Sequence, residues 1–251
     1  MRARCWCASH LPIHINSLGR RSKAGFRSEM RLLCLHGHRT SGSILREQMV
    51  EASAALEAAL GPALDLRFPN APHPARGPAQ QVVQATWPNT PYFEWWDKGE
   101  DGSYSGATET LEFIRDYEQM HGPFDGVVGF SQGGALAALL CSQVGSPAAV
   151  LPSLRLGLIM SGFVPADPVL KARVQAAAPI RVPTLLVYSS AWDFERQGAE
   201  QLGRLWATGA VTTSEHGGGH AVPRSKYAGG AAALEAMRLL AARASSFDGS
   251  S

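Results

Sequence analysis

Apolar runs and helix-like segments alternate along residues 30–244, and this alternation constrains the fold more than any other feature of the chain. The apolar runs are short and continuous, so they predict strands that are buried on both faces. The expected strands are residues 31–35, 64–68, 126–130, 156–160, 184–188 and 211–215. Such strands are typical of a parallel sheet, because the helices that connect them cover both of its faces.

Helical patterns fill the intervals between these strands. The expected helices are residues 42–60, 107–121, 132–144, 168–178, 195–207 and 230–244. Residues 69–89 are rich in Pro, Ala and Gln and predict a loop or a lid-like segment. Neither an internal repeat nor a change in composition follows Met30. We therefore expect a single α/β domain over residues 30–251, with a mostly parallel central sheet and helices on both faces.

The first 29 residues differ in composition from the rest. They hold six Lys and Arg residues against one acid, Glu29, and show no clean helical or strand period. This composition resembles an organelle transit peptide. Two further interpretations stay open: a true start at Met30, which directly precedes the first strand, and a plain disordered tail. In each case we expect residues 1–29 to lie outside the folded domain.

Net charge and cysteine content exclude several classes of protein. A net charge of +2 gives no broad nucleic-acid footprint, and no apolar run reaches the roughly 18–20 residues that span a bilayer. Four cysteines without a CxxC pair argue against a zinc or thioredoxin site. Cys34 and Cys141 lie in apolar runs and are expected to be buried thiols. These features favour a reducing compartment, the cytoplasm, or an organelle if residues 1–29 are a transit peptide.

The sequence Gly129-Phe130-Ser131-Gln132-Gly133 lies between an expected strand and an expected helix. This is the G-x-S-x-G pattern in the context that a nucleophile elbow requires. The turn is so tight that side chains at residues 129 and 133 would clash with it, and glycine avoids the clash. The turn places the Ser131 hydroxyl above the sheet at the N-terminus of a helix. Ser131 is therefore the predicted nucleophile.

A serine nucleophile needs a base, and in this arrangement the chain order is serine, acid, histidine. The segment Glu215-His216-Gly217-Gly218-Gly219-His220 directly follows the last expected strand. His220 lies on a glycine-rich loop that can reach over the serine, so it is the predicted base. His216, at the end of the strand, is the rival. The pair offers no clear third ligand for a metal, so no metal site is expected.

The acid orients the imidazole and stabilises its charged form. Asp193 follows the penultimate strand in the segment Ser189-Ser190-Ala191-Trp192-Asp193, so it is the predicted acid. Glu195 and Asp167 are the alternatives. Each of these carboxylates could instead be a surface charge or the N-cap of a helix.

Two backbone N–H groups are expected to form the oxyanion hole. One is the amide of Gln132, which directly follows the nucleophile. The other comes from the loop after the first strand, where His38 is the first choice and Arg39 the second. The His36 side chain is expected to anchor this loop. The pattern G-x-G-x-x-G is absent after the first strand and no P-loop occurs, so no cofactor is predicted.

Four segments together resemble the FSH family of eukaryotic serine hydrolases. They read LCLHGHRTSG, PYFEWW, GPFDGVVGFSQGGALAALL and EHGGGHAVPR, and the resemblance runs from about residue 30 to about residue 242. It implies the α/β-hydrolase fold, with Ser131 as nucleophile and His220 as base. It also supports Asp193, although SSAWD differs from the family's more usual glycine-containing loop.

The resemblance implies esterase or thioesterase activity on a small-molecule ester or thioester, in some cases with a long acyl chain. Aromatic residues follow the expected lid-like segment, and they could line an acyl pocket or pack a long loop onto the body. They are Trp87, Tyr92, Phe93, Trp95 and Trp96. A second class of function also stays open, a ligand-binding or signalling protein without catalysis on the same scaffold.

Overall fold

A six-stranded parallel sheet forms the centre of the molecule. The computed structural model describes residues 29–246, and its main sheet has the order β10-β9-β8-β7-β1-β2. These strands are β1 (Met30–Leu35), β2 (Leu64–Arg67), β7 (Gly126–Phe130), β8 (Leu156–Met160), β9 (Thr184–Ser189) and β10 (Val211–His216). Every neighbouring pair is parallel. The predicted fold class is therefore confirmed, and β7, which precedes Ser131, lies in the middle of the sheet.

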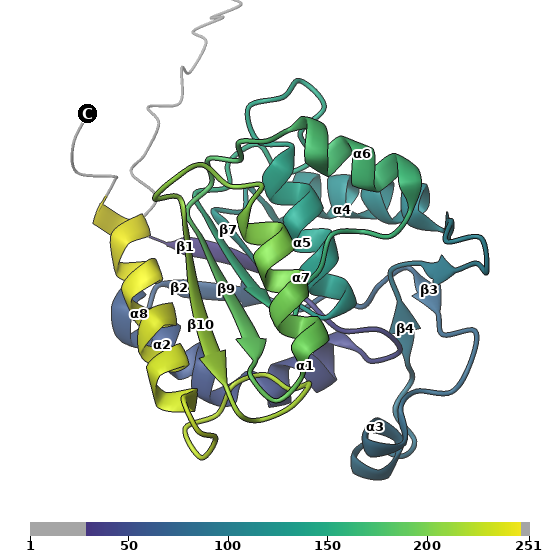
Figure 1. Cartoon of the computed structure of the whole chain (residues 1–251), viewed down its shortest axis with the longest axis horizontal. Coiled ribbons are helices and arrows are strands. Elements are labelled where there is room, and N and C mark those ends of the chain that lie inside the picture. The colour runs from purple at the N-terminus through teal and green to yellow at the C-terminus, as the bar shows by residue number, and fades with distance from the viewer. Residues whose placement is uncertain (1–28, 247–251) are drawn as a thin grey trace, which may run out of the picture.

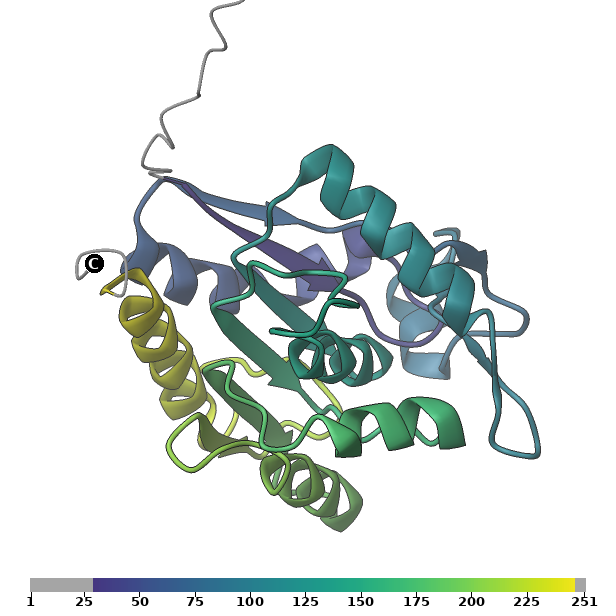
Figure 2. The same ribbon diagram turned by 90° about the horizontal axis from the view of Figure 1, so that it is seen from above.

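Helices cover both faces of this sheet (Figures 1 and 2). On one face lie α1 (Gly42–Gln48), α2 (Val50–Leu60) and α8 (Gly230–Ser246). On the other face lie α4 (Ala107–His121), α5 (Gln132–Ser142), α6 (Pro168–Ala176) and α7 (Asp193–Gly203). Alternate residues of each strand enter the two cores; in β1, for example, Leu32 packs with α2 and α8, whereas Leu33 packs with α4 and α5. This double burial explains the continuous apolar runs in the sequence.

The long connection between β2 and α4 is more ordered than the sequence predicts. It contains α3 (Gln81–Thr86) and four strands of two residues each. These strands are β3 (His73–Pro74), β4 (Phe93–Glu94), β5 (Asp97–Lys98) and β6 (Tyr104–Ser105), paired as β3-β4 and β5-β6. Figure 1 shows α3 at the outer end of this excursion. Two-residue strands are too short to show a period, so sequence patterns cannot reveal them.

Several element boundaries also differ from expectation. The single helix expected over residues 42–60 is divided at Met49, whose backbone leaves the helical region. Helix α7 begins at Asp193, two residues before the expected start. The elements α4, β7 and β8 have the expected bounds. The shift in α7 matters most, because it changes which carboxylate faces the site.

The remaining expectations concern thiols, membrane spans and the N-terminal segment. Cys34 and Cys141 are buried, as expected, with 0% and 1% of their surface exposed. None of the helices within residues 29–246 is long and apolar enough to cross a membrane. The expectation for residues 1–29 falls, apart from Glu29, outside the described residues.

Candidate active site

Ser131 lies in a strained turn between β7 and α5. Its backbone has φ 56° and ψ −115°, a conformation that side-chain-bearing residues rarely adopt. A Cβ on Gly129 would lie 2.1 Å from the carbonyl oxygen of Gly133, and one on Gly133 would lie 2.1 Å from that of Leu35. Any side chain at either position would collide with backbone, so only glycine permits this turn. The two glycines thus allow the strain that raises Ser131 above the sheet.

His220 connects the serine to a carboxylate. Its Nε2 lies 2.9 Å from the Ser131 Oγ, and its Nδ1 lies 2.6 Å from Oε1 of Glu195. The imidazole comes from the loop after β10, as predicted. Trp192 stacks on it at a centroid distance of 6.0 Å with an interplanar angle of 2°, while Phe130 contacts its other side at 5.1 Å. The ring is therefore held between two aromatic side chains with both nitrogens engaged.

The carboxylate that the structure places on His220 belongs to Glu195, the alternative acid. The Asp193 side chain lies outside the described part of the structure, so its predicted role stays a prediction. Helix α7 begins at Asp193, so Glu195 belongs to its first turn, where it is 4% exposed. Its Oε2 accepts hydrogen bonds from the Ser189 N–H at 2.9 Å and the Ser161 hydroxyl at 2.8 Å. Burial alone would raise the pKa of Glu195, but the hydrogen bonds from His220, Ser189 and Ser161 hold it below its usual value. The carboxylate therefore stays ionised at neutral pH.

His216 and Asp167, the remaining candidates for base and acid, have structural positions away from the serine. His216 is 1% exposed, accepts a hydrogen bond from the Gly218 N–H at 3.1 Å, and stacks on Tyr227. Burial lowers the pKa of His216. Asp167 is the N-cap of α6, where its carboxylate accepts N–H groups from residues 169 and 170. Neither residue competes with the pairing of His220 and Glu195.

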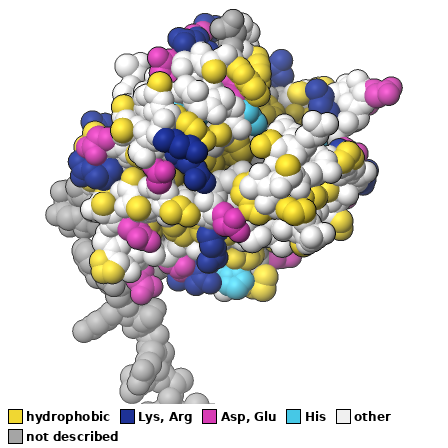
Figure 3. Space-filling view, turned by 90° about the horizontal axis from the view of Figure 1, so that it is seen from below, with side chains coloured by type: hydrophobic (Ala, Val, Ile, Leu, Met, Phe, Trp, Pro, Cys, Tyr) yellow, Lys and Arg dark blue, Asp and Glu magenta, His cyan; other side chains and the backbone are white. Residues whose placement is uncertain are grey.

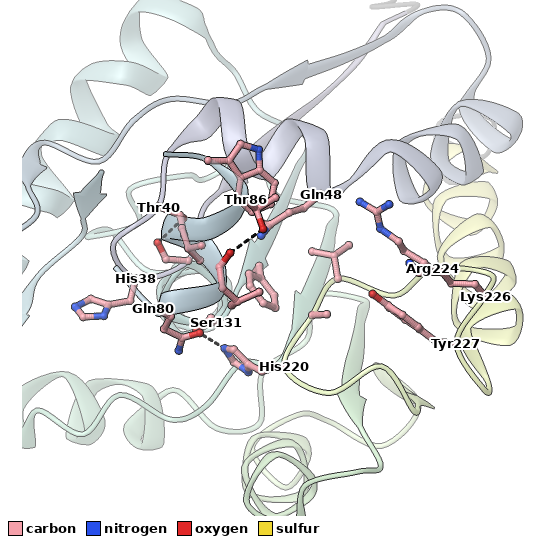
Figure 4. A pocket seen from close by; sticks show the side chains of 17 residues that line it. His38, Thr40, Gln48, Gln80, Thr86, Ser131, His220, Arg224, Lys226 and Tyr227 are labelled. Carbon is pink, nitrogen blue, oxygen red and sulfur yellow. Dashed lines mark hydrogen bonds between the residues drawn. The ribbon is translucent and has the colours of Figure 1, made fainter. Parts of the chain in front are cut away.

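Of the two residues expected to supply the oxyanion donors, Gln132 directly follows Ser131 and His38 borders the same pocket as Ser131. Gln132 is the first residue of α5, so its N–H is free of the helical ladder. Its side chain is fixed by hydrogen bonds with the backbone of Trp95 and Trp96, at 2.9 and 2.8 Å. Gly37 brings the loop after β1 against the serine, since a Cβ there would lie 3.5 Å from the Ser131 Cβ. His38, the next residue, turns its imidazole away from the serine (Figure 4).

A buried carboxylate that the sequence does not reveal fixes the shape of this loop. Glu94 of β4 is fully buried and accepts a hydrogen bond from the Arg39 Nε at 3.1 Å. The His38 Nε2 lies 3.3 Å from the same carboxylate, and the Arg76 N–H donates to it at 3.2 Å. Arg39 itself has a positive φ of 52°. Glu94 therefore ties this loop to β4 through the side chains of Arg39 and His38.

His36 anchors the start of this loop, as expected. Its Nδ1 lies 2.8 Å from the Gly37 carbonyl oxygen, while its Nε2 accepts the Ala71 N–H at 2.9 Å. This pair of bonds requires the neutral ring with its proton on Nδ1. Burial lowers the pKa of His36 from 6.5 to about 4, a shift that its bond to Gly37 only partly opposes.

We expect this histidine to make the protein less stable in acid. The unfolded chain takes up the proton near pH 6.5 and the folded chain only near pH 4, so the free energy of unfolding falls as the pH drops between these values. The loss amounts to about 3 kcal/mol. Urea unfolding at pH 7 and pH 4 measures it. His36→Gln, which keeps an acceptor for the Ala71 N–H, should lose less; an equal loss in both proteins would contradict this origin.

Of the five aromatic residues for which an acyl pocket and packing of the long connection were both open, four pack the connection onto the body. Trp95 is fully buried and donates from Nε1 to the His36 carbonyl oxygen at 2.9 Å. Trp96, 2% exposed, stacks on Tyr104. The Tyr92 hydroxyl donates to the Trp87 carbonyl oxygen, and Phe93 packs against the core beneath α4 and α5. These four are absent from the linings of the two pockets at Ser131, which favours the packing alternative, whereas Trp87 borders the larger pocket.

Trp95→Ala should therefore affect stability and not substrate choice. Removing a fully buried Trp from a core is expected to lower the free energy of unfolding by about 3–5 kcal/mol. The acyl-chain preference of the remaining activity should not change, because Trp95 borders neither pocket. Chemical denaturation and a series of esters of increasing chain length measure the two effects. A shifted chain-length optimum at unchanged stability would contradict the packing role.

Two pockets meet at Ser131 and His220. The larger has a volume of about 460 Å³ and runs between α3 and the loop that follows His220. The smaller, about 270 Å³, runs beside the start of α7 and has Phe163, Trp192 and Phe194 in its walls. Figure 3 looks onto this side of the molecule and shows a hollow with hydrophobic side chains in its floor. The sequence did not reveal these three aromatic residues, which lie in the loop after β8, at the N-cap of α7 and in its first turn, and which share no pattern.

Comparison with known proteins agrees with this geometry. The sequence matches the serine hydrolase (FSH1) family over residues 26–231. The human esterase OVCA2 is 32% identical over 212 residues, which cover 77% of this chain and 89% of the relative. The Drosophila melanogaster esterase CG5412 is 27% identical, and the aligned region covers 80% of this chain and 71% of the relative.

Solved structures show the same fold. The Bacillus cereus carboxylesterase superposes with a TM-score of 0.54 at 13% identity, covering 87% of this chain and 90% of its own. A carboxylesterase from Mesorhizobium loti gives a TM-score of 0.52 at 17% identity, and the superposition covers 82% of this chain and 87% of the carboxylesterase chain. Fold and site therefore define a serine hydrolase with the α/β-hydrolase fold, of the class that cleaves carboxylic esters. Within that class, the chain belongs to the FSH1 family of serine hydrolases.

Proposed function

We propose that residues 30–251 act as one catalytic domain that hydrolyses carboxylic esters or thioesters through an acyl-enzyme. The observation that carries this proposal is the continuous chain of contacts from Ser131 through His220 to Glu195, at 2.9 and 2.6 Å. A serine hydroxyl is a weak nucleophile, and a hydrogen-bonded imidazole that is itself held by a carboxylate activates it.

Acylation begins when Ser131 Oγ attacks the carbonyl carbon and passes its proton to His220 Nε2. The negative charge that develops on the carbonyl oxygen is met by the N–H groups of Gln132 and His38, our proposed oxyanion hole. Glu195 stabilises the imidazolium through Nδ1. The intermediate collapses, the bond to the leaving oxygen or sulfur breaks, and the alkoxide or thiolate takes the proton from His220. Water then repeats these steps on the acyl-enzyme and releases the acid.

The smaller pocket is suited to a hydrocarbon chain. Trp192 and Phe194 expose 44% and 62% of their surfaces, and their rings contact each other at a centroid distance of 5.3 Å. Phe163 completes this apolar wall beside the nucleophile. Exposed aromatic surface next to a reactive group gains free energy when an acyl chain covers it.

Phe194→Ala is therefore expected to weaken the preference for longer chains. Phe194 takes no part in the hydrogen bonds that link Ser131, His220 and Glu195. The variant should lower kcat/KM for an octanoyl ester relative to an acetyl ester by about tenfold, since covering a Phe ring is worth about 1.5 kcal/mol or more. Met120→Ala removes an equally exposed apolar side chain from α4 and should change nothing. An unchanged octanoyl-to-acetyl ratio in Phe194→Ala would assign the chain to another surface.

The proposal as a whole is tested with the purified full chain on p-nitrophenyl esters and acyl thioesters of two to sixteen carbons. We expect turnover, and we expect a fluorophosphonate to label Ser131, located by mass spectrometry. A folded protein that neither turns over any substrate nor reacts with the probe would overturn the proposal and favour a ligand-binding function. Because Cys34 and Cys141 are free thiols, we also propose that the protein works in a reducing compartment.

A further inference from the structure

The larger pocket carries positive charge at the end remote from the nucleophile. Arg224, Lys226 and Tyr227 lie there on the loop before α8, while Ser131 and His220 lie at the other end (Figure 4). Among the described residues that border this pocket, none is Asp or Glu. Building on the proposed function, we propose that this pocket binds the arm of the substrate that ends in an anionic group, a carboxylate or a phosphate.

The two cations are available to a ligand. Arg224 is half-buried, and its Nη2 makes a long contact of 3.4 Å with the Glu47 carbonyl oxygen. Within residues 29–246, no carboxylate lies within 4.0 Å of either cationic group. Two acids lie nearby, outside the pocket lining. The Glu47 carboxylate accepts the Trp87 Nε1–H at 2.7 Å. Glu51 accepts the Ser225 N–H, which lowers its pKa, and the charges of Arg224 and Lys226 lower it further. The guanidinium is thus positioned by backbone and not neutralised by a direct ion pair.

A buried amide in the same pocket also lacks a partner. The Gln48 Oε1 is shielded from solvent and makes no hydrogen bond. A buried polar atom without a partner is costly, so a ligand that hydrogen-bonds there gains that free energy. Rotation of the amide about its last bond exchanges Oε1 for Nε2, so Gln48 can offer either an acceptor or a donor. Gln48 borders the pocket together with Arg224 and Tyr227, which makes this end polar as well as cationic.

The two pockets differ in the side chains that line them, so each suits a different part of the substrate. Three aromatic rings line the smaller pocket, which suits hydrocarbon, whereas the larger one has two cations and a phenol at its far end and the Gln48 amide in its lining. Charged groups that line a partly enclosed pocket favour ligands of opposite charge and disfavour like charge. We therefore expect a substrate with one apolar arm and one anionic arm.

Pairs of esters that differ only in the terminal charge test this inference. With the charge on the acyl arm, mono-p-nitrophenyl suberate is compared with p-nitrophenyl octanoate. With the charge on the alcohol arm, the octanoyl esters of 4-hydroxybutanoate and of 3-hydroxypropyl phosphate are compared with that of butanol. In at least one series we expect kcat/KM to favour the anionic ester by about tenfold, as a charge-assisted hydrogen bond gives. The carboxylate and phosphate esters distinguish the two anions.

The preference should depend on the two cations. The double variant Arg224→Gln, Lys226→Gln should lower the anionic-to-neutral ratio about tenfold, and Arg224→Lys should keep part of it. High salt should also reduce the ratio in the wild type, because it screens the interaction. Arg204→Gln is the matched control. It removes a cation at the C-terminal end of α7, whose side chain is 77% exposed, and it should leave the ratio unchanged.

Binding measured without turnover separates this inference from the proposed function. Ser131→Ala cannot cleave the esters, so calorimetric titration measures their affinities directly. In Ser131→Ala, an anionic ester should bind more tightly than its neutral counterpart. If this difference disappears in the triple variant Ser131→Ala, Arg224→Gln, Lys226→Gln, the inference is supported even if the wild type turns over nothing. The inference would be overturned if the wild type turned over neutral esters, showed no preference for the anionic ester in either series, and kept the same ratio in the double variant. The proposed function would then remain intact.

Discussion

Ser131→Ala is expected to lower kcat for ester hydrolysis by a factor on the order of 10⁵–10⁶, with the protein still folded. The size follows from the mechanism: without Oγ there is no acyl-enzyme, and His220 and Glu195 have no nucleophile to activate. The fold should survive, because the Ser131 side chain makes no capping hydrogen bond with α5. Alanine at φ 56° has the same Cβ as serine, so the turn carries no new strain.

The measurement is steady-state turnover of p-nitrophenyl butyrate, with circular dichroism and thermal unfolding as the folding controls. Fluorophosphonate labelling should disappear in the same variant, since the probe reacts with the activated hydroxyl. Residual activity above about one per cent, in a preparation free of contaminating esterases, would show that another group attacks the ester. Loss of folding would instead indicate that the hydroxyl has a structural role that the hydrogen bonds do not show.

The sequence was sufficient to predict the sheet. It also singled out Ser131 and His220, which the structure brings together, and it offered Glu195 as an alternative acid. Continuous apolar runs predict a doubly covered parallel sheet, because no other common environment buries both faces of a strand. Ser131 is predictable because the clash at Gly129 and Gly133 leaves a local signature. His220 is predictable because a glycine-rich loop follows a strand. In each case the physical constraint acts within a few residues of the chain.

The parts that the sequence did not predict depend on contacts between distant segments. The pocket walls combine α3, the loop after β8 and the start of α7, three segments more than 25 residues apart in sequence. Trp95 and Trp96 are residue types that often line pockets, but here they lie in the core, where they pack with residues of α4 and α5. Aromatic residues satisfy either environment, so composition alone could not distinguish the two.

The sequence leaves the choice between Asp193 and Glu195 open for a particular physical reason. Asp193 and Glu195 lie two residues apart, and which one faces His220 depends on where α7 begins. A helical start at residue 195 would leave Asp193 in the loop above the site. The observed start at Asp193 turns Glu195 inward, where the Ser189 N–H and the Ser161 hydroxyl hold it. Helix ends are uncertain by a residue or two even when the helix itself is clear from the sequence.

Glu195→Gln should therefore lower kcat by roughly 10³–10⁴-fold, the range expected when the partner of a catalytic histidine loses its charge. The glutamine oxygen can keep the hydrogen bonds from Ser189 and Ser161, so the amide nitrogen should face His220 Nδ1. An amide N–H there needs an acceptor, which moves the imidazole proton to Nε2. Nε2 then can no longer accept the proton of Ser131, although shape and packing are preserved.

Asp193→Asn is the matched control, since it changes an acid two residues away while Glu195 keeps its place on His220. We expect it to alter kcat by less than about threefold. Glu195→Asp separates charge from position: it keeps the carboxylate but shortens the reach by one methylene, so its activity should fall between those of the wild type and Glu195→Gln. The reverse pattern, a large loss in Asp193→Asn and a small one in Glu195→Gln, would identify Asp193 as the acid. It would also mean that the 2.6 Å contact between Glu195 and His220 is not the one used in catalysis.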